Sequence, residues 1–142
     1  SVGGRNAVTP MAEVWLVDDD VADNHFHERV LRRSDFTDRV KSFERPEVAL
    51  AALCDPAVEL PSLLLLDINM PGMSGFELLE RLSASCPRRL TELDVYVLST
   101  SADRSEERRA LAMSGVRGFF VKPLNGEHLA VIESSSPAAD EE

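Results

Sequence analysis

Four consecutive leucines, residues 63–66, run directly into Asp67 in the stretch "LLLLDINMPG". A run that is apolar at every position, without alternation, is typical of a β-strand covered on both faces, as in a parallel sheet flanked by helices. The leucines therefore predict an inner strand of a layered α/β domain. Burial accounts for the leucines, but it does not account for a strand that ends in a carboxylate, so Asp67 needs a separate explanation.

Strand-like and helix-like patterns alternate over the rest of the chain. Runs typical of strands occupy residues 13–18, 38–43, 62–67, 94–99 and 118–121. Helical periodicity covers residues 23–33, 45–54, 75–85, 105–115 and 126–133. This alternation predicts one doubly wound α/β domain with a five-stranded parallel sheet and five helices on its two faces. In the first helix, the spacing of Ala22, Phe26 and Val30 predicts that these residues form the buried stripe.

The composition fits a single globular domain with a net negative charge. The chain has 142 residues, of which 44% are hydrophobic and 28% charged, and its formal net charge is -10. This charge disfavours direct binding to nucleic acid or to an anionic membrane, and it favours cations or basic partners. No apolar run is long enough to span a bilayer, and the N-terminus lacks a secretory signal, so we expect a cytoplasmic protein with no membrane partner.

The ends of the chain and the cysteines lead to further expectations. We expect residues 1–11 to be a disordered extension, or one left from expression, residues 12–133 to form the domain, and residues 134–142 to be a flexible acidic tail. Cys54 and Cys86 have no CxxC spacing and no histidine at metal-ligand spacing. We therefore expect free thiols rather than a disulfide.

Polar and charged residues stand where the predicted strands end. Asp18 and Asp19 follow the first strand, Asp67 ends the third, Ser99 ends the fourth, and Lys122 follows the fifth. In doubly wound sheets the ligand site lies beyond the carboxyl ends of the strands, so these side chains should converge there. Crowded carboxylates repel one another unless a cation neutralises them, and Mg²⁺ prefers such oxygen ligands. The pattern predicts a magnesium site beside a lysine and a hydroxyl group.

This set of groups is suited to phosphoryl transfer onto Asp67. Such chemistry depends mainly on alignment and on the neutralisation of negative charge. Asp67 would be the nucleophile and form an acyl phosphate, while Lys122 and Mg²⁺ contact the transferred oxygens and Ser99 donates a hydrogen bond. The sequence has no GxxxxGK[ST] phosphate loop, so the phosphoryl group must come from another molecule rather than from bound ATP.

Four segments, in this order, resemble the receiver domain of bacterial two-component response regulators. They are "WLVDDD", "LLLLDINMPGMSGFELL", "VYVLSTS" and "GFFVKPL", within a resemblance that covers about residues 12–132. It implies the flavodoxin-like receiver fold with strand order 2-1-3-4-5, as in the single-domain receivers of chemotaxis. It also implies Mg²⁺ as the only cofactor, a sensor histidine kinase or histidine phosphotransfer protein as phosphodonor, and an unidentified downstream protein partner.

The resemblance also assigns roles to individual residues. Asp67 is the phosphoacceptor, Asp18, Asp19 and the backbone carbonyl of Asn69 complete the metal site with it, Lys122 and Ser99 assist the transfer, and Ser99 and Phe119 form the switch. A cis peptide bond before Pro123 is implied as well. The implied protein is a signalling phosphoacceptor that catalyses its own phosphotransfer and slow dephosphorylation, and it switches a partner-binding surface rather than acting as an enzyme on a separate substrate.

Several neighbouring residues have simpler explanations. Asp20 and Asp23 are expected to cap and stabilise the start of the first helix. His25 and His27 are expected to be exposed residues of that helix, without a ligand role. The last helix is short in the sequence pattern, so we expect a monomer or weak dimer, and either a stand-alone receiver or one cut from a longer protein.

Two other functions stay open at this point. An aspartyl-nucleophile phosphohydrolase also forms an acyl phosphate with Mg²⁺ on an α/β sheet, but it usually has an acid two residues after the nucleophile, where this chain has Asn69. A receiver-like interaction module that takes no phosphate usually lacks one of the site residues, and this chain has all of them.

Overall fold

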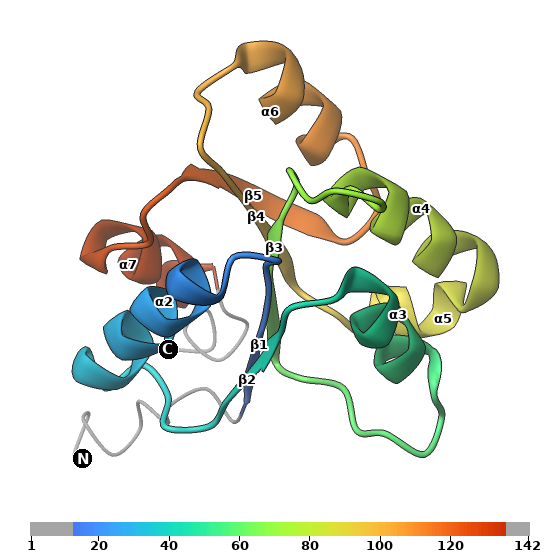
Figure 1. Cartoon of the computed structure of the whole chain (residues 1–142), viewed down its shortest axis with the longest axis horizontal. Helices are drawn as coiled ribbons and strands as arrows, with labels where there is room; N and C mark the ends of the chain where they lie inside the picture. The colour runs from blue at the N-terminus through green and yellow to red at the C-terminus, as the bar shows by residue number, and fades with distance from the viewer. Residues whose placement is uncertain (1–12, 136–142) are drawn as a thin grey trace.

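In the computed structural model, residues 13–135 form a five-stranded parallel sheet with helices on both faces (Figure 1). The strands are β1 (Val14–Val17), β2 (Val40–Phe43), β3 (Leu63–Asp67), β4 (Val95–Ser99) and β5 (Val116–Val121). The helices are α2 (Val21–Arg33), α3 (Pro46–Cys54), α4 (Gly75–Ser85), α5 (Pro87–Thr91), α6 (Arg104–Leu111) and α7 (Gly126–Ser134). Residues 1–12 and 136–142 are not described, so the expected extension and most of the expected tail lie outside the described residues. Within residues 13–135, no helix combines the length and the apolar character that crossing a membrane requires.

The strand order is β2-β1-β3-β4-β5, and every neighbouring pair is parallel, which confirms the predicted sheet. The register pairs Val17 at the end of β1 with Leu66 in β3. It also pairs Ser99 at the end of β4 with Val121 at the end of β5. The residues that end β1, β3, β4 and β5, Asp67 among them, therefore share one edge of the sheet.

The leucine run of β3 is buried because both faces of the sheet are covered. Leu64 and Leu66 belong to the apolar layer beneath α3, α4 and α5, whereas Leu63 and Leu65 belong to the layer beneath α2 and α7. Figure 1 shows α2 and α7 together on one side of the sheet and α3, α4 and α5 on the other. All four leucines are at most 1% exposed, so the prediction of an inner strand is confirmed.

The predicted buried stripe of α2 is wrong. Ala22 and Phe26 are exposed, Phe26 by 46%, and Val30 is only partly buried. The buried residues of this helix are Asn24, His27 and Leu31. His27 was expected to be exposed and is buried, whereas His25 is exposed. The Asn24 amide donates hydrogen bonds to two main-chain carbonyl groups at 2.9 and 3.4 Å, which offsets the cost of its burial, so a pattern that counts only apolar residues misses this helix face.

Several elements differ from their predicted ranges. The sequence pattern does not predict the short helix α5. Helix α6 ends at Leu111 and not at Gly115, and Gly115 itself adopts a φ of 87°, a left-handed conformation outside the helix. Strand β5 begins at Val116, two residues before the predicted segment.

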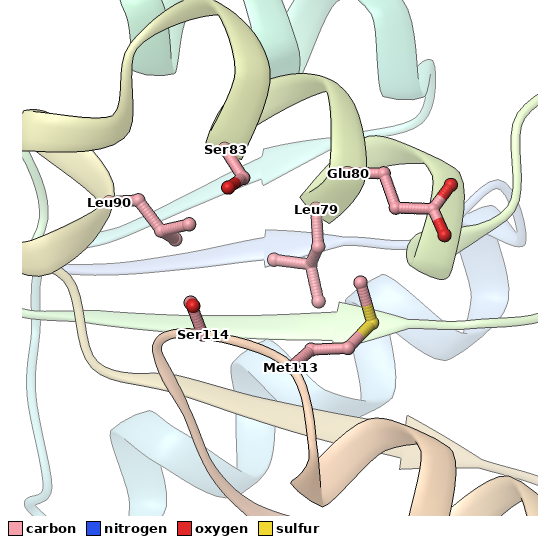
Figure 2. A pocket seen from close by; sticks show the side chains of 6 residues that line it. All are labelled: Leu79, Glu80, Ser83, Leu90, Met113 and Ser114. Carbon is pink, nitrogen blue, oxygen red and sulfur yellow. The ribbon is translucent and has the colours of Figure 1, made fainter.

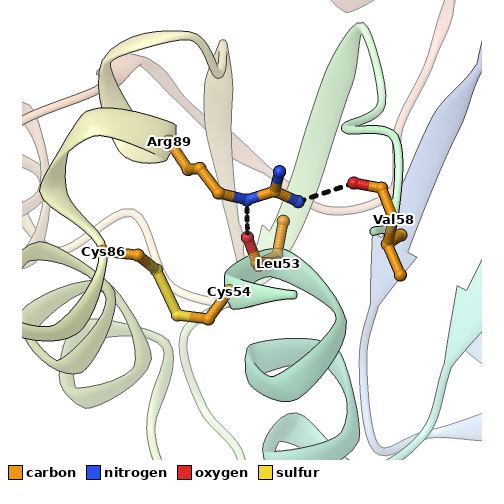
Figure 3. Close-up of a disulfide and its surroundings, with 5 residues drawn as sticks. All are labelled: Leu53, Cys54, Val58, Cys86 and Arg89. Carbon is orange, nitrogen blue, oxygen red and sulfur yellow. Dashed lines mark hydrogen bonds between the residues drawn. A yellow bond between two sulfur atoms is a disulfide. The ribbon is translucent and has the colours of Figure 1, made fainter. Parts of the chain in front are cut away.

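The expectation of free thiols is also wrong, because Cys54 and Cys86 form a disulfide (Figure 3). Cys54 ends α3, and Cys86 lies between α4 and α5. Their Cα atoms are 5.8 Å apart, although the residues are separated by 32 positions in the sequence. The pairing arises because α3, α4 and α5 pack on the same face of the sheet, which spacing alone does not reveal. Arg89 joins the same elements, since its Nε and Nη2 donate to the carbonyl oxygens of Leu53 and Val58 at 2.6 and 2.8 Å.

Gly75, the first residue of α4, lies against the strand end that carries Asp67. A Cβ atom at Gly75 would be 2.6 Å from the carbonyl oxygen of Asp67 and 2.9 Å from the Cα atom of Ile68. We expect Gly75→Ala to lower the free energy of unfolding by about 1–3 kcal/mol, because the main chain must move to make room. The matched control is Gly126→Ala, since Gly126 begins α7 and its Cβ would meet no atom within 4 Å. Urea unfolding compares the two variants, and equal stability would contradict this close approach.

Candidate functional site

Three carboxylates meet at the carboxyl edge of the sheet. Asp18 follows β1, Asp19 is the next residue, and Asp67 ends β3. One carboxylate oxygen from each residue lies within 4.8 Å of the other two. Asp18 and Asp67 are each 3% exposed, whereas Asp19 faces solvent. These three residues, called the acidic cluster below, combine two buried carboxylates with one that solvent reaches.

Lys122 directly follows β5, and its ammonium group lies among these carboxylates. Its Nζ is 2.7 Å from Asp18 Oδ2, 2.8 Å from Asp23 Oδ2 and 3.3 Å from Asp67 Oδ1. Burial alone lowers the pKa of this ammonium group, but its contacts with the three carboxylates raise the pKa above its ordinary value. Lys122 therefore stays charged and neutralises part of the negative charge. The peptide bond between Lys122 and Pro123 is cis, in agreement with the resemblance.

The surroundings of Asp67 make its ionised form costly. Burial, and after it the Asp18 carboxylate, raise the pKa of Asp67 to about 6. Lys122 and the backbone N–H of Asn69 favour the ionised form, but their combined contribution is smaller. Apart from the ion pair with Lys122, Asp67 Oδ1 is buried and accepts no well-aligned hydrogen bond from the described residues. A further cation at this point would be bound favourably, because it would relieve the repulsion between the carboxylates.

The donor atoms of the acidic cluster fit a hard divalent cation. All three residues offer carboxylate oxygens, the kind of ligand that Mg²⁺ prefers. Oδ1 of Asp67 pairs with Lys122 but accepts no well-aligned hydrogen bond from the described residues, and such an ion would satisfy this acceptor. Asn69 is exposed two residues after Asp67, and the use of its carbonyl oxygen as a further ligand stays a prediction.

The two predicted switch residues lie next to α6. Ser99, the last residue of β4, is 0% exposed, and its hydroxyl donates to Glu106 Oε1 at 3.1 Å rather than to the acidic cluster. Phe119 is partly buried against a small apolar cluster that includes Ala110 of α6. The neighbouring Phe120 is 9% exposed and belongs to the core, so Phe119 is the more accessible of the two rings. Ser99 thus contacts α6 directly, and Phe119 packs against a cluster to which α6 contributes Ala110.

Asp20 caps α2 as expected, since its side chain accepts from two N–H groups of the first turn. Two other residues, Asp23 and Asn24, take part in this site in a way that the sequence analysis misses. Asp23 was expected only to stabilise the start of α2, but its carboxylate accepts a hydrogen bond from Lys122 Nζ. It is therefore a fourth carboxylate beside the acidic cluster. Asn24 donates to the carbonyl oxygen of Asp18 and so holds the end of β1 in place. The sequence shows only that Asp23 is an acidic residue in the first turn of a helix. Such residues are common there because they stabilise the helix N-terminus, so this position does not by itself indicate a contact with Lys122.

We expect Asp23→Asn to lower the free energy of unfolding by about 1 kcal/mol in buffer with EDTA, because it breaks a partly buried ion pair with Lys122. The Asp23 side chain is 37% exposed, which limits the effect. In a double-mutant cycle, Asp23→Asn should cost much less stability in the Lys122→Met background than in wild type. The reason is that the loss comes from the ion pair between Asp23 and Lys122, which this background already lacks. Fully additive effects of the two substitutions would instead show that Asp23 acts only on the helix start.

A cavity of about 210 Å³ lies apart from these residues, against α4, α5 and the turn before β5 (Figure 2). Its lining residues are Leu79, Glu80, Ser83, Leu90, Met113 and Ser114. The cavity shares no residue with the acidic cluster, so the chemistry described above belongs to the edge of the sheet and not to this cavity.

The sequence matches a known family over most of its length. The model of the response regulator receiver domain matches residues 14–132. The two-component response regulator ORR6 of Oryza sativa subsp. japonica is 33% identical over 111 residues, which are 78% of this chain and 62% of that protein. The probable methanogenesis regulatory protein FilR2 of Methanothrix harundinacea is 32% identical over 119 residues, which are 82% of this chain and 75% of that protein. This chain therefore spans less than two thirds of the rice protein.

A solved structure has the same arrangement of elements. The crystal structure of a two-component response regulator from Cytophaga hutchinsonii aligns with a TM-score of 0.85 and 25% identity, over 93% of this chain and 99% of that chain. The strand order, the acidic cluster at the carboxyl edge of the sheet and the family match over residues 14–132 agree with one another. The chain belongs to the response regulator receiver domain family of two-component signalling.

Proposed function

We propose that this chain accepts a phosphoryl group on Asp67, in the presence of Mg²⁺, from a phosphorylated histidine of a sensor kinase or a histidine phosphotransfer protein. The observation that carries the proposal is the convergence of the acidic cluster and Lys122 on one edge of the sheet. Receiver domains are signalling phosphoacceptors rather than enzymes with a separate substrate, and this chain is a member of that family.

In the transfer step, a carboxylate oxygen of Asp67 attacks the phosphorus atom while the bond between phosphorus and the histidine nitrogen breaks. The electron pair of that bond stays on the imidazole nitrogen, and the product is an acyl phosphate on Asp67. Lys122 would contact one of the transferred oxygens, since its Nζ already lies 3.3 Å from Asp67 Oδ1. Its fixed positive charge stabilises the added negative charge without any proton transfer.

Asp18, Asp19 and Asp67 would hold the Mg²⁺, with the backbone carbonyl of Asn69 as a further ligand. Bound Mg²⁺ supplies positive charge to the carboxylates and to the transferred oxygens. The raised pKa of Asp67 indicates how strongly the site resists additional negative charge, so we expect very little transfer in the presence of EDTA.

Phosphorylation would change the surface formed by α6, β5 and α7. A phosphoryl group adds roughly -1.5 to -2 charges and three acceptor oxygens at the edge of the sheet. Ser99 would turn its hydroxyl toward these oxygens, and Phe119 would move further into the space beneath α6. Because the switched and unswitched states need to differ by only a few kcal/mol, one phosphoryl group is sufficient to change which state a partner protein meets.

Chemical trapping tests the identity of the acceptor. Borohydride reduces an aspartyl phosphate to homoserine and leaves an unmodified aspartate intact. After incubation with acetyl phosphate and Mg²⁺ followed by borohydride, peptide mass spectrometry should find homoserine in place of Asp67 alone. Homoserine in place of Asp18 or Asp19, with Asp67 unchanged, would contradict the proposal.

The two alternative functions make different predictions. A phosphohydrolase would turn over a phosphomonoester and lose this activity in Asp67→Asn, but Asn69 occupies the position where such an enzyme usually carries its acid. An interaction module that takes no phosphate would bind no Mg²⁺ at the acidic cluster. Isothermal titration with Mg²⁺ separates this second alternative from the phosphoacceptor.

A further inference from the structure

The hydroxyl group of Ser99 is already engaged by a residue outside the acidic cluster. Ser99 Oγ donates to Glu106 Oε1 at 3.1 Å and accepts from the N–H of Ser101 at 3.0 Å. Glu106 lies in the first turn of α6 and is partly buried. Two more hydrogen bonds join residues that are close in the sequence between β4 and α6. Asp103 N donates to Ser101 Oγ at 3.1 Å, and Ser105 N donates to Asp103 Oδ1 at 2.8 Å. The end of β4 is thus tied to the start of α6.

The other end of α6 is held to the body of the domain by different contacts. The Arg109 guanidinium lies 4.0 Å from the centroid of the Phe76 ring, and Arg109 Nη2 is 3.8 Å from Glu80 Oε2. Ala110 is 0% exposed within the small apolar cluster that Phe119 packs against. The last turn of α6 therefore has its own anchors, and the Glu106 carboxylate is the side-chain link between its first turn and β4.

A serine hydroxyl has a single proton to donate. While that proton is bonded to Glu106, Ser99 cannot donate it to a phosphoryl group on Asp67. From this exclusivity we propose that Glu106 is a positioning residue: it holds the Ser99 hydroxyl in the unphosphorylated chain and competes with the phosphoryl group for it. The inference rests on the proposed function, because it assigns a regulator to the same Asp67 site.

Release of Ser99 would leave the Glu106 carboxylate without its donor, next to a newly charged site. Both effects favour movement of the first turn of α6 away from the edge of the sheet, while Arg109 and Ala110 hold the last turn. Loss of the phosphoryl group would let Ser99 bond Glu106 again. Glu106 thus links the state of Asp67 to the position of one end of α6, and it opposes switching in the absence of phosphate.

The test compares Glu106→Ala and Glu106→Gln with wild type, and the matched control is Glu107→Ala. Glu107 is the next residue of α6, is also partly buried, and its carboxylate makes no hydrogen bond or ion pair with the residues that the structure describes. The probe is beryllofluoride with Mg²⁺, since beryllofluoride bonds a carboxylate oxygen in the geometry of a phosphoryl group. Amide NMR spectra of ¹⁵N-labelled protein follow the titration and give the dissociation constant.

We expect Glu106→Ala to bind beryllofluoride roughly three- to tenfold more tightly than wild type, because it removes a charge-assisted hydrogen bond that binding must break. Glu106→Gln keeps an acceptor of the same shape and should lie between the two. Without beryllofluoride, the α6 amide signals of Glu106→Ala should move part of the way toward their positions in the bound wild type. Glu107→Ala should match wild type in both measurements.

A double-mutant cycle shows whether Glu106 acts through Ser99. In the Ser99→Ala background there is no hydroxyl to hold, so Glu106→Ala should no longer change the dissociation constant. A gain that persists in this background, or a Glu106→Ala variant that equals Glu107→Ala, would overturn the inference while leaving the proposed function intact. Failure of wild type itself to bind beryllofluoride with Mg²⁺ would instead count against the proposed function and remove the basis of the inference with it.

Discussion

Reduction of the disulfide between Cys54 and Cys86 is expected to lower the free energy of unfolding by about 2–4 kcal/mol, because the bond closes a long loop and restricts the unfolded chain. The two residues are 32 positions apart. The folded state should survive reduction, since Arg89 still joins the ends of α3 and α5 through its bonds to Leu53 and Val58. Urea unfolding with and without dithiothreitol measures the change as a shift of the midpoint.

The control for this prediction is the variant with both Cys54→Ser and Cys86→Ser. Its stability should equal that of the reduced wild type, and dithiothreitol should not change it further. Because the disulfide lies in the layer beneath α3, α4 and α5 and not at the acidic cluster, phosphoryl uptake should be the same in reduced and oxidised protein. An unfolding midpoint that does not respond to the reductant would show that the disulfide adds no stability.

Asp67→Asn is expected to stabilise the protein by about 1–3 kcal/mol above pH 6.5 in EDTA, because it removes a buried charge that the fold disfavours. The pKa of Asp67 is raised to about 6 in the folded chain, whereas the unfolded chain has the ordinary value of 3.8. Between these two values the folded state holds the proton and the unfolded state does not. Wild-type stability therefore falls as the pH rises from about 4 to 6, relative to the variant, and stays lower above that range.

The measurement is urea unfolding of wild type and Asp67→Asn at several values between pH 4 and 7.5. Asp38→Asn is the matched control, since Asp38 is exposed and its carboxylate makes no hydrogen bond or ion pair among residues 13–135. Saturating Mg²⁺ should reduce the difference between wild type and Asp67→Asn, because the cation offsets the buried charge in wild type. A pH-independent difference, or a less stable Asp67→Asn, would contradict the described environment of Asp67.

The fold could be predicted because its main signals are local. The leucines at 63–66 are apolar at every position, and a strand with both faces covered is the arrangement that buries all of them. The predicted buried face of α2 was wrong because the burial of this helix does not follow its apolar residues. Asn24 and His27 are polar and are nevertheless buried. Asn24 is tolerated there only because two main-chain carbonyl groups accept from its amide, and those partners come together only in the folded chain.

The acidic cluster could be predicted because parallel strands bring their carboxyl ends to one edge of a sheet. The positions of Asp18 and Asp67 therefore follow from the strand pattern alone. The contacts of Asp23 with Lys122 and of Ser99 with Glu106 do not follow from it, because each joins a strand end to a helix through flexible side chains. The disulfide could not be predicted for a similar reason. Cys54 and Cys86 meet because their helices pack on the same face of the sheet, and their spacing in the sequence does not reveal this.

The central claim is that Asp67 accepts a phosphoryl group with the help of Mg²⁺. Intact mass spectrometry after incubation with acetyl phosphate tests it most directly, for wild type and Asp67→Asn, each with Mg²⁺ and with EDTA. We predict that wild type gains the mass of one phosphoryl group only with Mg²⁺ and that Asp67→Asn gains none under either condition. No gain in wild type, or an equal gain in Asp67→Asn, would contradict the claim.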